Sequence, residues 1–166
     1  MDFKRTEEQE LLLESLRTVY ERGDFEEYFK ECDRNHAYPS KAVEAMVEAG
    51  FSSLGIPEEH GGTETDLLTQ VMVAEEAPAL GWPSLSWINF STEVDDILAF
   101  GNEQQQAQIL EYALQGRKPF TLGFTEPQAG SDSAAMATTA TKRDGKVYIS
   151  GVKTFNTSAD MAPFML

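Results

Sequence analysis

Cysteine, histidine and basic residues are scarce in this 166-residue chain, and each shortage excludes a class of function. The single cysteine, Cys32, rules out an intrachain disulfide or a Cys-x-x-Cys site, and His36 and His60 are too few for a multi-histidine zinc site. Only 13 Lys and Arg residues stand against 28 Asp and Glu, so the net charge is −15. Nucleic acids and anionic lipid surfaces would repel such a chain.

Long apolar segments are absent as well. No run approaches the roughly 18 residues that mark a membrane span. The residues after Met1 are charged, unlike the apolar core of a secretory signal, so a reducing, cytoplasmic location is expected. The chain is nevertheless 41% hydrophobic, which is enough apolar material to bury a core.

Charge and composition change together near residue 117, which divides the chain into two expected domains, 1–116 and 117–166. The first carries 7 basic and 24 acidic residues, a net charge of −17, and is rich in Glu, Leu and Ala. The second carries 6 basic and 4 acidic residues, a net charge of +2, and is rich in Thr, Gly and Ser. These compositions predict a helical domain followed by a β-rich domain.

About six helices are expected in the first domain, from the spacing of apolar residues and from helix start and stop signals. Thr6 and Gln9 form a capping box, Asp24 is expected to cap the second helix, and Asn102 is expected to cap the sixth. The fourth helix is expected over residues 65–77, with four apolar side chains turned inward: Leu67, Leu68, Val71 and Met72.

Several residues that often carry chemistry have structural interpretations here. Cys32 lies on an apolar helix face and is expected to be a core thiol. Trp82 and Trp87 are expected to pack helices together. His36 and His60 are expected on the surface or in loops, because neither has a nucleophile nearby in the sequence.

The second domain shows the two-residue period of β-strands. Residues 119–124 form a strand-like run, Asp144-Gly145 is a strong hairpin turn signal, and residues 162–166 begin another apolar strand. Two or three strands do not make a stable sheet alone, so an isolated chain is expected to self-associate. The predicted fold is α+β: an all-α helical bundle followed by the start of an antiparallel β-barrel-like domain that is truncated.

The most informative stretch is residues 125–132, Thr-Glu-Pro-Gln-Ala-Gly-Ser-Asp, where a strand enters a loop of small residues. Gly130 allows a ligand to approach the backbone closely, and the amides of residues 129–132 can form an anion-binding nest. Judged on loop chemistry alone, a plain turn in which Ser131 and Asp132 cap a short helix is the commoner outcome.

The sequence Thr-Glu-Pro-x-Ala-Gly-Ser-Asp resembles the flavin-binding signature of the acyl-CoA dehydrogenase family. Seven specified residues arise by chance on the order of once in 10⁸ to 10⁹ start positions. Three further segments resemble the family in order and spacing: a loop between N-terminal helices at 57–62, a hairpin at 146–153, and a second flavin-contacting strand at 155–158. The resemblance covers the whole chain but less than half of the family's usual length.

This resemblance implies a binding site for FAD. Phe124 and Thr125 would lie along the pyrimidine edge of the flavin, with Thr125 donating toward N1 and O2. Ser131 would reach the pyrophosphate or the pantetheine arm of the substrate thioester. Phe155 would pack on the ring system, and Thr157 would donate to N5, the atom that accepts the hydride. The complete implied set of cofactor-binding residues is Phe124, Thr125, Gly130, Ser131, Phe155 and Thr157.

Three residues of this site depart from the family's usual pattern. Phe124 replaces an aliphatic residue, Asn156 replaces Ile, and Ser158 replaces Asn. These changes bear on cofactor affinity and redox tuning more than on the fold. No catalytic or metal-binding residue is expected here, because the family's base is a Glu of a C-terminal helical domain and the resemblance gives Glu126 a structural role.

Residues 1–3, 31–34 and 38–39 are similar to the crotonobetainyl-CoA reductase branch of the family. The acyl pocket of the family is lined in part by the helix expected over residues 84–100. Four polar side chains there favour a polar or short acyl group, such as a carnitine-derived thioester: Ser84, Ser86, Asn89 and Ser91.

Three functions stay open at this point. The first is the N-terminal portion of an FAD-dependent acyl-CoA dehydrogenase or enoyl-CoA reductase, inactive as the chain alone. Its partners would be an acyl-CoA substrate, an electron-transfer flavoprotein and further copies of itself, usually in a tetramer. The second is a non-catalytic acidic helical interaction module, or one half of a split flavoprotein. The third is an oxidase or flavin monooxygenase of the same superfamily.

Overall fold

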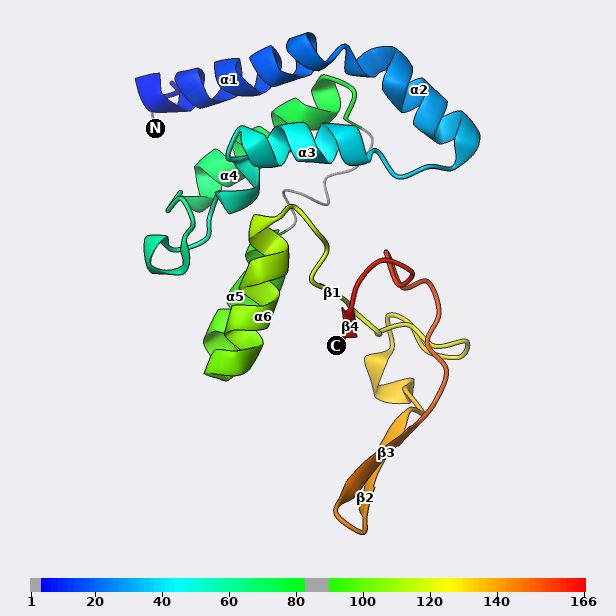
Figure 1. Cartoon of the computed structure of the whole chain (residues 1–166). Helices are drawn as coiled ribbons and strands as arrows, with labels where there is room; N and C mark the ends of the chain where they lie inside the picture. Colours follow the sequence, from blue (N-terminus) through cyan, green and yellow to red (C-terminus); the bar gives the residue numbers. More distant parts are fainter. Residues whose placement is uncertain (1–3, 83–89) are drawn as a thin grey trace. The chain divides into compact units, whose positions relative to one another are not determined.

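The computed structural model describes residues 4–82 and 90–166, with the backbone alone for residues 90–93. The chain divides into two compact units, Met1–Arg117 and Lys118–Leu166. The first is helical, and the second holds the strands (Figure 1). Some expectations fall outside the described residues or side chains, namely those for Ser84, Ser86, Trp87, Asn89 and Ser91.

Six α-helices build the described part of the first unit, in agreement with the sequence. Two short 3₁₀ helices, η1 (Phe51–Ser53) and η2 (Glu58–His60), lie between α3 and α4. No described helix is long and apolar enough to cross a membrane. The α-helices are α1 (Glu7–Gly23), α2 (Phe25–Asn35), α3 (Ser40–Glu48), α4 (Leu67–Ala79), α5 (Phe90–Phe100) and α6 (Glu103–Leu114).

Side-chain caps fix where α1 and α6 begin. The Thr6 hydroxyl accepts from the Gln9 amide at 3.2 Å, and the Gln9 side chain accepts from the Thr6 amide at 2.9 Å. Asn102 and Gln105 form the same reciprocal pair at α6, at 3.0 and 2.9 Å. Both predicted caps are confirmed, and each satisfies amides that the helix itself leaves without a partner.

Asp24 occupies the predicted N-cap position of α2, but its side chain does not cap the helix. Because α1 runs through Gly23, Asp24 is the only residue between α1 and α2, and it adopts a left-handed conformation with φ of 47°. Its amide donates to the Glu21 carbonyl and ends α1, while its side chain makes no capping hydrogen bond to α2. A capping side chain needs extended backbone at its own residue, which this one-residue connection does not allow.

An aromatic cluster lies in the core of the helical unit. The ring centroid of Trp82 lies 5.3 Å from those of Phe25 and Phe29 and 6.0 Å from that of Tyr20, all in the tilted arrangements that aromatic pairs prefer. The expected packing role of Trp82 and the burial of Cys32 are confirmed. Aliphatic side chains complete the core, among them Leu13, Leu16, Val43, Met46, Ile56, Val73, Val94 and Leu110.

The expected inward face of α4 is wrong for three of its four residues. Leu67, Leu68 and Val71 are 69, 65 and 52% exposed, and the buried residues are Thr69, Val73 and Ala77. The sequence Leu-Leu-Thr-Gln-Val-Met-Val-Ala has apolar residues on every side of a helix, so its period does not identify one face. Contacts with α1 determine instead which face of α4 is buried. One of them is the hydrogen bond that the Gln9 side-chain amide donates to the Thr69 hydroxyl at 2.9 Å.

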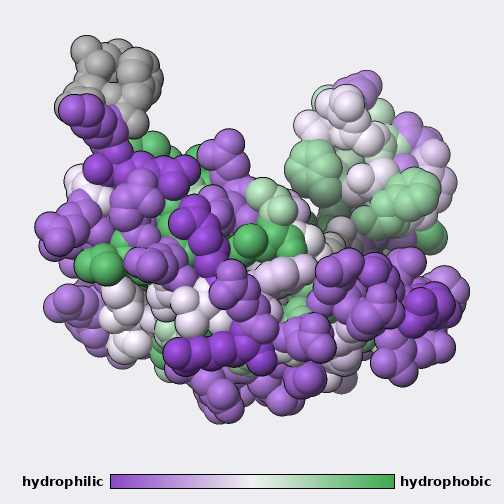
Figure 2. Space-filling model, turned by 90° about the horizontal axis from the view of Figure 1, so that it is seen from above, coloured by the Kyte–Doolittle hydropathy of each residue, from purple (hydrophilic) through white to green (hydrophobic). Residues whose placement is uncertain are grey.

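The surface of the chain is mostly hydrophilic on the face drawn in Figure 2, where apolar side chains form patches between polar ones. This agrees with the 28 acidic residues of the sequence. His36 is exposed at the end of α2, and His60 lies partly exposed in η2, as expected. Single exposed leucines, such as Leu67 and Leu68 on α4, are ordinary on such a surface.

A hairpin is the main strand structure of the second unit. Strands β2 (Thr139–Arg143) and β3 (Lys146–Ser150) pair antiparallel, with Thr139 opposite Ser150. Asp144 and Gly145 join them with φ values of 51° and 73°, the left-handed pair of a type I′ turn. The predicted turn is confirmed.

A second strand pair is shorter and runs parallel. Strands β1 (Phe120–Thr121) and β4 (Phe164–Met165) pair with Phe120 opposite Phe164. The start of a β domain is thus confirmed, although this pair was expected to be antiparallel like the rest. A tight turn would return the chain antiparallel, whereas β4 follows a long connection, which permits parallel pairing. The 3₁₀ helix η3 (Ser133–Ala135) precedes β2.

Two leucine substitutions test which helix faces are buried. Leu16→Ala should lower the free energy of unfolding by about 2–5 kcal/mol, because it leaves a cavity in the core. Leu68→Ala, the matched control on the exposed face of α4, should change it by no more than about 0.5 kcal/mol. Urea unfolding of both variants measures the difference, and a large loss for Leu68→Ala would contradict the observed face.

Candidate functional site

The two segments that resemble flavin-contacting strands lie side by side in the second unit. The amide of Thr154 donates to the carbonyl of Thr125 at 2.8 Å, and the hydroxyl of Thr121 donates to the carbonyl of Thr157 at 2.8 Å. The amide of Gly123 also donates to the carbonyl of Leu166 at 2.8 Å. Residues 121–125 and 154–157 are therefore held together, although about thirty positions separate them.

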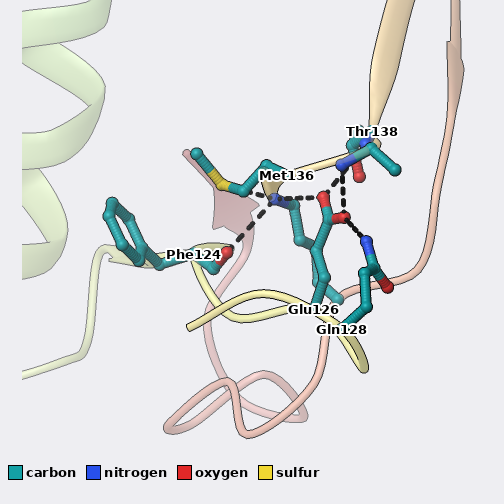
Figure 3. A network of polar contacts seen from close by, with 7 residues as sticks. Phe124, Glu126, Gln128, Met136 and Thr138 are labelled. Carbon is teal, nitrogen blue, oxygen red and sulfur yellow. Dashed lines mark hydrogen bonds and ion pairs between the residues drawn. The ribbon is translucent and has the colours of Figure 1, made fainter. Parts of the chain in front are cut away.

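The carboxylate of Glu126 lies at the centre of this arrangement and is only 4% exposed (Figure 3). One oxygen, Oε2, accepts from the Ala137 amide at 2.7 Å and from the Gln128 side-chain amide at 2.6 Å. The other oxygen, Oε1, accepts from the Thr138 amide at 3.0 Å and from Lys153 Nζ at 2.9 Å. Four donors thus fill the acceptor positions of the carboxylate.

Lys153 is the cation of this network. Besides its ion pair with Glu126, its ammonium lies 3.3 Å from the Phe124 carbonyl and 3.5 Å from the Met136 sulfur. Its side chain is 18% exposed. One ammonium therefore contacts Phe124 and Glu126 in the first segment and Met136, which lies between η3 and β2.

Hydrogen bonds stabilise the ionised form of Glu126. Hydrogen bonding from Thr138, the Ala137 amide and the Lys153 ammonium together hold the pKa of the Glu126 carboxyl far below its usual value near 4.5, and burial opposes them more weakly. Glu126 is consequently ionised at neutral pH and has no free lone pair for a proton in transit. The structural role expected for Glu126 agrees with this geometry.

The structure brings four of the six expected cofactor residues onto these two adjacent segments. Phe124 is 55% exposed and Phe155 93% exposed, while Thr125 is half-buried and Thr157 exposed. Gly130 and Ser131 lie farther along the loop, beyond a tight turn in which the Glu126 amide and the Ala129 carbonyl are 2.7 Å apart. A Cβ on Gly130 would meet no atom within 4 Å, so open space lies beside its backbone.

The second segment has an uncommon backbone. Phe155 and Ser158 have φ values of 57° and 61°, in the left-handed region that residues other than glycine seldom adopt. Asn156 Oδ1 is buried and has no hydrogen-bond partner among the described residues. Such outliers concentrate at ligand sites, where they place side chains that an ordinary strand would turn elsewhere.

These features fit a flavin. A flavin ring system has apolar faces and a polar edge, and the two segments offer exposed aromatic rings together with hydroxyls. A bound group with an N–H would also satisfy Asn156 Oδ1. Within the described ranges, no three or more His, Cys, Asp or Glu residues are grouped so that they could hold a metal ion.

Sequence reasoning missed Lys153, Gln128 and the amides of Ala137 and Thr138 as parts of the site. A lysine between apolar and small residues is a signal in itself, because a half-buried ammonium needs a carboxylate. Glu126 is the only glutamate after residue 111, which would have made it the first candidate partner. The amides carry no sequence signal, since every residue except proline has one.

Comparison with known proteins agrees with this geometry. Residues 6–117 match the model of the acyl-CoA dehydrogenase N-terminal domain, and residues 121–166 match that of the acyl-CoA dehydrogenase middle domain. The chain belongs to the acyl-CoA dehydrogenase family. It is 42% identical, over its whole length, to the probable acyl-CoA dehydrogenase YdiO of Escherichia coli K12 and covers 43% of that protein.

Solved structures of other proteins share the fold. Butyryl-CoA dehydrogenase of Megasphaera elsdenii superimposes with a TM-score of 0.78 and 25% identity, over 98% of this chain and 44% of the other. A structure described as the electron transferring flavoprotein of Acidaminococcus fermentans gives a TM-score of 0.77 and 29% identity, over 98% and 43%. The chain thus spans less than half the length of the relatives it matches.

The Glu126 network predicts a specific loss of stability in acid. Because the folded pKa lies below the unfolded value near 4.5, the unfolded chain binds a proton in a pH range where the folded chain does not. The stabilisation is complete above that value and declines as pH falls through it toward the folded pKa. The protection factors of the Ala137 and Thr138 amides, that is, their exchange rates relative to the intrinsic rate at each pH, should therefore fall below about pH 4.5.

Two variants isolate this effect from the other carboxylates. Glu126→Gln should lose the acid-dependent component of exchange at these two amides. Asp160→Asn, a matched change at an exposed carboxylate of the same unit, should keep it. Identical pH profiles for Glu126→Gln and the unaltered protein would mean that Glu126 does not control this part of the fold.

Proposed function

We propose that the protein is an FAD-dependent oxidoreductase that acts on CoA thioesters, removing hydrogens from Cα and Cβ of the acyl group or reversing that reaction. The observation that supports this most is the pairing of residues 121–125 with 154–157, because it sets exposed rings and hydroxyls beside one another on the segments that resemble flavin-contacting strands. Family membership and the two domain matches support the same reaction class.

The residues of this chain would bind and orient the cofactor. Thr125 donates toward the N1 and O2 edge, where a donor stabilises negative charge on a reduced ring, and Thr157 donates to N5. Phe155 covers a face of the ring and excludes water there, with Phe124 at the edge. FAD, when bound, supplies hydride-accepting chemistry. Ser131, with the open backbone at Gly130, contacts the pyrophosphate or the pantetheine arm of the thioester.

The proposal includes partners and location. A homo-oligomer, an acyl-CoA substrate and an electron-transfer flavoprotein as electron acceptor are the partners we propose, and the cytoplasm is the proposed compartment. The similarity to the crotonobetainyl-CoA reductase branch favours a short or polar acyl group. Glu126 does not act as the base in this scheme, because its carboxylate is buried and already accepts four hydrogen bonds.

Absorbance of the complete gene product that carries these residues tests the proposal. The protein should be yellow, or become so after reconstitution with FAD, and a CoA thioester should bleach the flavin band without oxygen. Rapid reoxidation by oxygen would favour the oxidase, and reduction by a nicotinamide nucleotide would favour the monooxygenase. A protein that FAD cannot reconstitute would instead support the acidic interaction module.

Substitution of Thr157 tests its proposed role at N5. Thr157→Val should slow flavin reduction by acyl-CoA about 2- to 10-fold, the effect of one neutral hydrogen bond. It should not unfold the protein, because the hydrogen bond from Thr121 ends on the Thr157 carbonyl and survives the change. Rapid-mixing absorbance measures the rate.

The matched control is Thr121→Val. It removes the buried hydroxyl that donates to the Thr157 carbonyl, so it should lower stability by about 0.5–1.5 kcal/mol. Its Thr157 hydroxyl stays in place, so the reduction rate should fall less than in Thr157→Val. Equal reduction rates for Thr157→Val and the unaltered protein would remove Thr157 from the site.

A further inference from the structure

The side chain of Lys153 connects the two paired segments of the candidate site and the stretch before β2. Its ammonium contacts the Phe124 carbonyl, the Glu126 carboxylate and the Met136 sulfur, at 3.3, 2.9 and 3.5 Å. The next residue, Thr154, donates its amide to the Thr125 carbonyl. Two adjacent residues therefore attach the second segment to three consecutive residues of the first, Phe124 to Glu126.

We propose that the Glu126–Lys153 ion pair is a positioning device that sets the spacing and register of the two flavin-contacting segments, and thereby the affinity for FAD. This inference rests on the proposed function. Neither side chain needs to touch the cofactor: the pair acts through the backbone of Phe124 and Thr125 on one side and of Thr154 and Phe155 on the other. Both are positioning residues rather than catalytic ones.

The carbonyl directions along the first segment support this role. The Phe124 carbonyl accepts from Lys153 and the Thr125 carbonyl accepts from the Thr154 amide, so both backbone oxygens are used inside the protein. Carbonyl oxygens turned toward a ring that gains negative charge would repel it. By holding both carbonyls, Lys153 and Thr154 leave side chains, such as the Thr125 hydroxyl, to face a ligand.

The second unit has few buried apolar side chains, which explains why an ion pair positions its two segments. Phe120 and Ala129 are its only buried hydrophobic residues apart from Pro119, and residues 118–166 are all described. Hydrophobic contacts therefore do little to fix the two segments against each other. An ion pair with hydrogen bonds is directional, and removal of one partner leaves the other charge buried and uncompensated.

The experiment uses the complete gene product with the variants Lys153→Met and Lys153→Arg. Lys153→Met keeps the apolar stem but loses the charge, so hydrogen exchange of the Thr154 amide should accelerate roughly tenfold or more even before FAD is added. FAD affinity, from a flavin fluorescence titration, should weaken roughly tenfold or more, since a displaced segment misplaces several contacts at once. Lys153→Arg keeps the cation and should restore most of both properties.

Two controls separate positioning from loss of stability. Lys146→Met makes the same change at an exposed lysine of β3 and should alter neither reading. Gly145→Ala strains the hairpin turn, where φ is 73°, and touches no member of the ion pair, so it should lower stability while FAD affinity and the flavin absorbance spectrum stay unchanged. Equal losses of affinity in Gly145→Ala and Lys153→Met would overturn the inference.

The two measurements, hydrogen exchange of the Thr154 amide and affinity for FAD, also distinguish the inference from the function on which it rests. If the unaltered protein binds FAD and Lys153→Met matches it in exchange and affinity, the inference fails and the proposed function stands. If the unaltered protein does not bind FAD at all, the proposed function fails, and the positioning role fails with it. Faster exchange together with weaker FAD binding, both restored by Lys153→Arg, supports the inference.

Discussion

The buried carboxylate of Glu126 is the constraint on which the second unit depends. Four donors from three stretches of chain converge on it, and one of them is the ammonium of Lys153. An ionised group this deeply buried is tolerated only where every acceptor position is used. The chain must therefore bring residues 128, 137–138 and 153 to one place, and that requirement folds the signature loop against the second segment.

The two units are stabilised by different interactions. The helical unit has a continuous core of aromatic and aliphatic side chains, and its 24 acidic residues far outnumber the 8 basic residues available to pair with them. One ion pair ties two helices together, that between Arg17 on α1 and Glu76 on α4 at 2.6 Å, whereas Lys30 pairs with Glu26 and Glu27 within α2. The second unit lacks such a core, so directional polar contacts fix its geometry.

The sequence was a good guide wherever one or two residues decide the local structure. The capping box at Thr6, the N-cap at Asn102 and the turn at Asp144-Gly145 form as expected, because their chemistry acts over three or four positions. The sequence was a poor guide where tertiary contacts determine the local structure. The phase of α4 depends on α1, since its own apolar residues surround the helix. Asp24 is set by the closeness of two helices, and the parallel pair β1–β4 by the path of a long connection.

The candidate site divides in the same way. A signature of seven specified residues identified the loop and its partner segment, and the structure places four of the six expected residues on the paired segments. The contacts that hold the segments together were not visible, because they run from Lys153 and from backbone amides that no motif records. Long-range pairing of this kind follows from the fold and not from any local pattern.

Phe155 shows how the fold and the proposed ligand depend on each other. A left-handed conformation at a residue other than glycine costs of order 1–3 kcal/mol, and this ring is 93% exposed, so the chain itself gains no burial in return. Covering a Phe side chain contributes about 1.5–3 kcal/mol, which is comparable to that cost. A planar ring system lying on Phe155 would therefore offset the strain, whereas water does not. Under the proposed function, the cost of the backbone conformation at Phe155 would be offset by the cofactor that covers its ring.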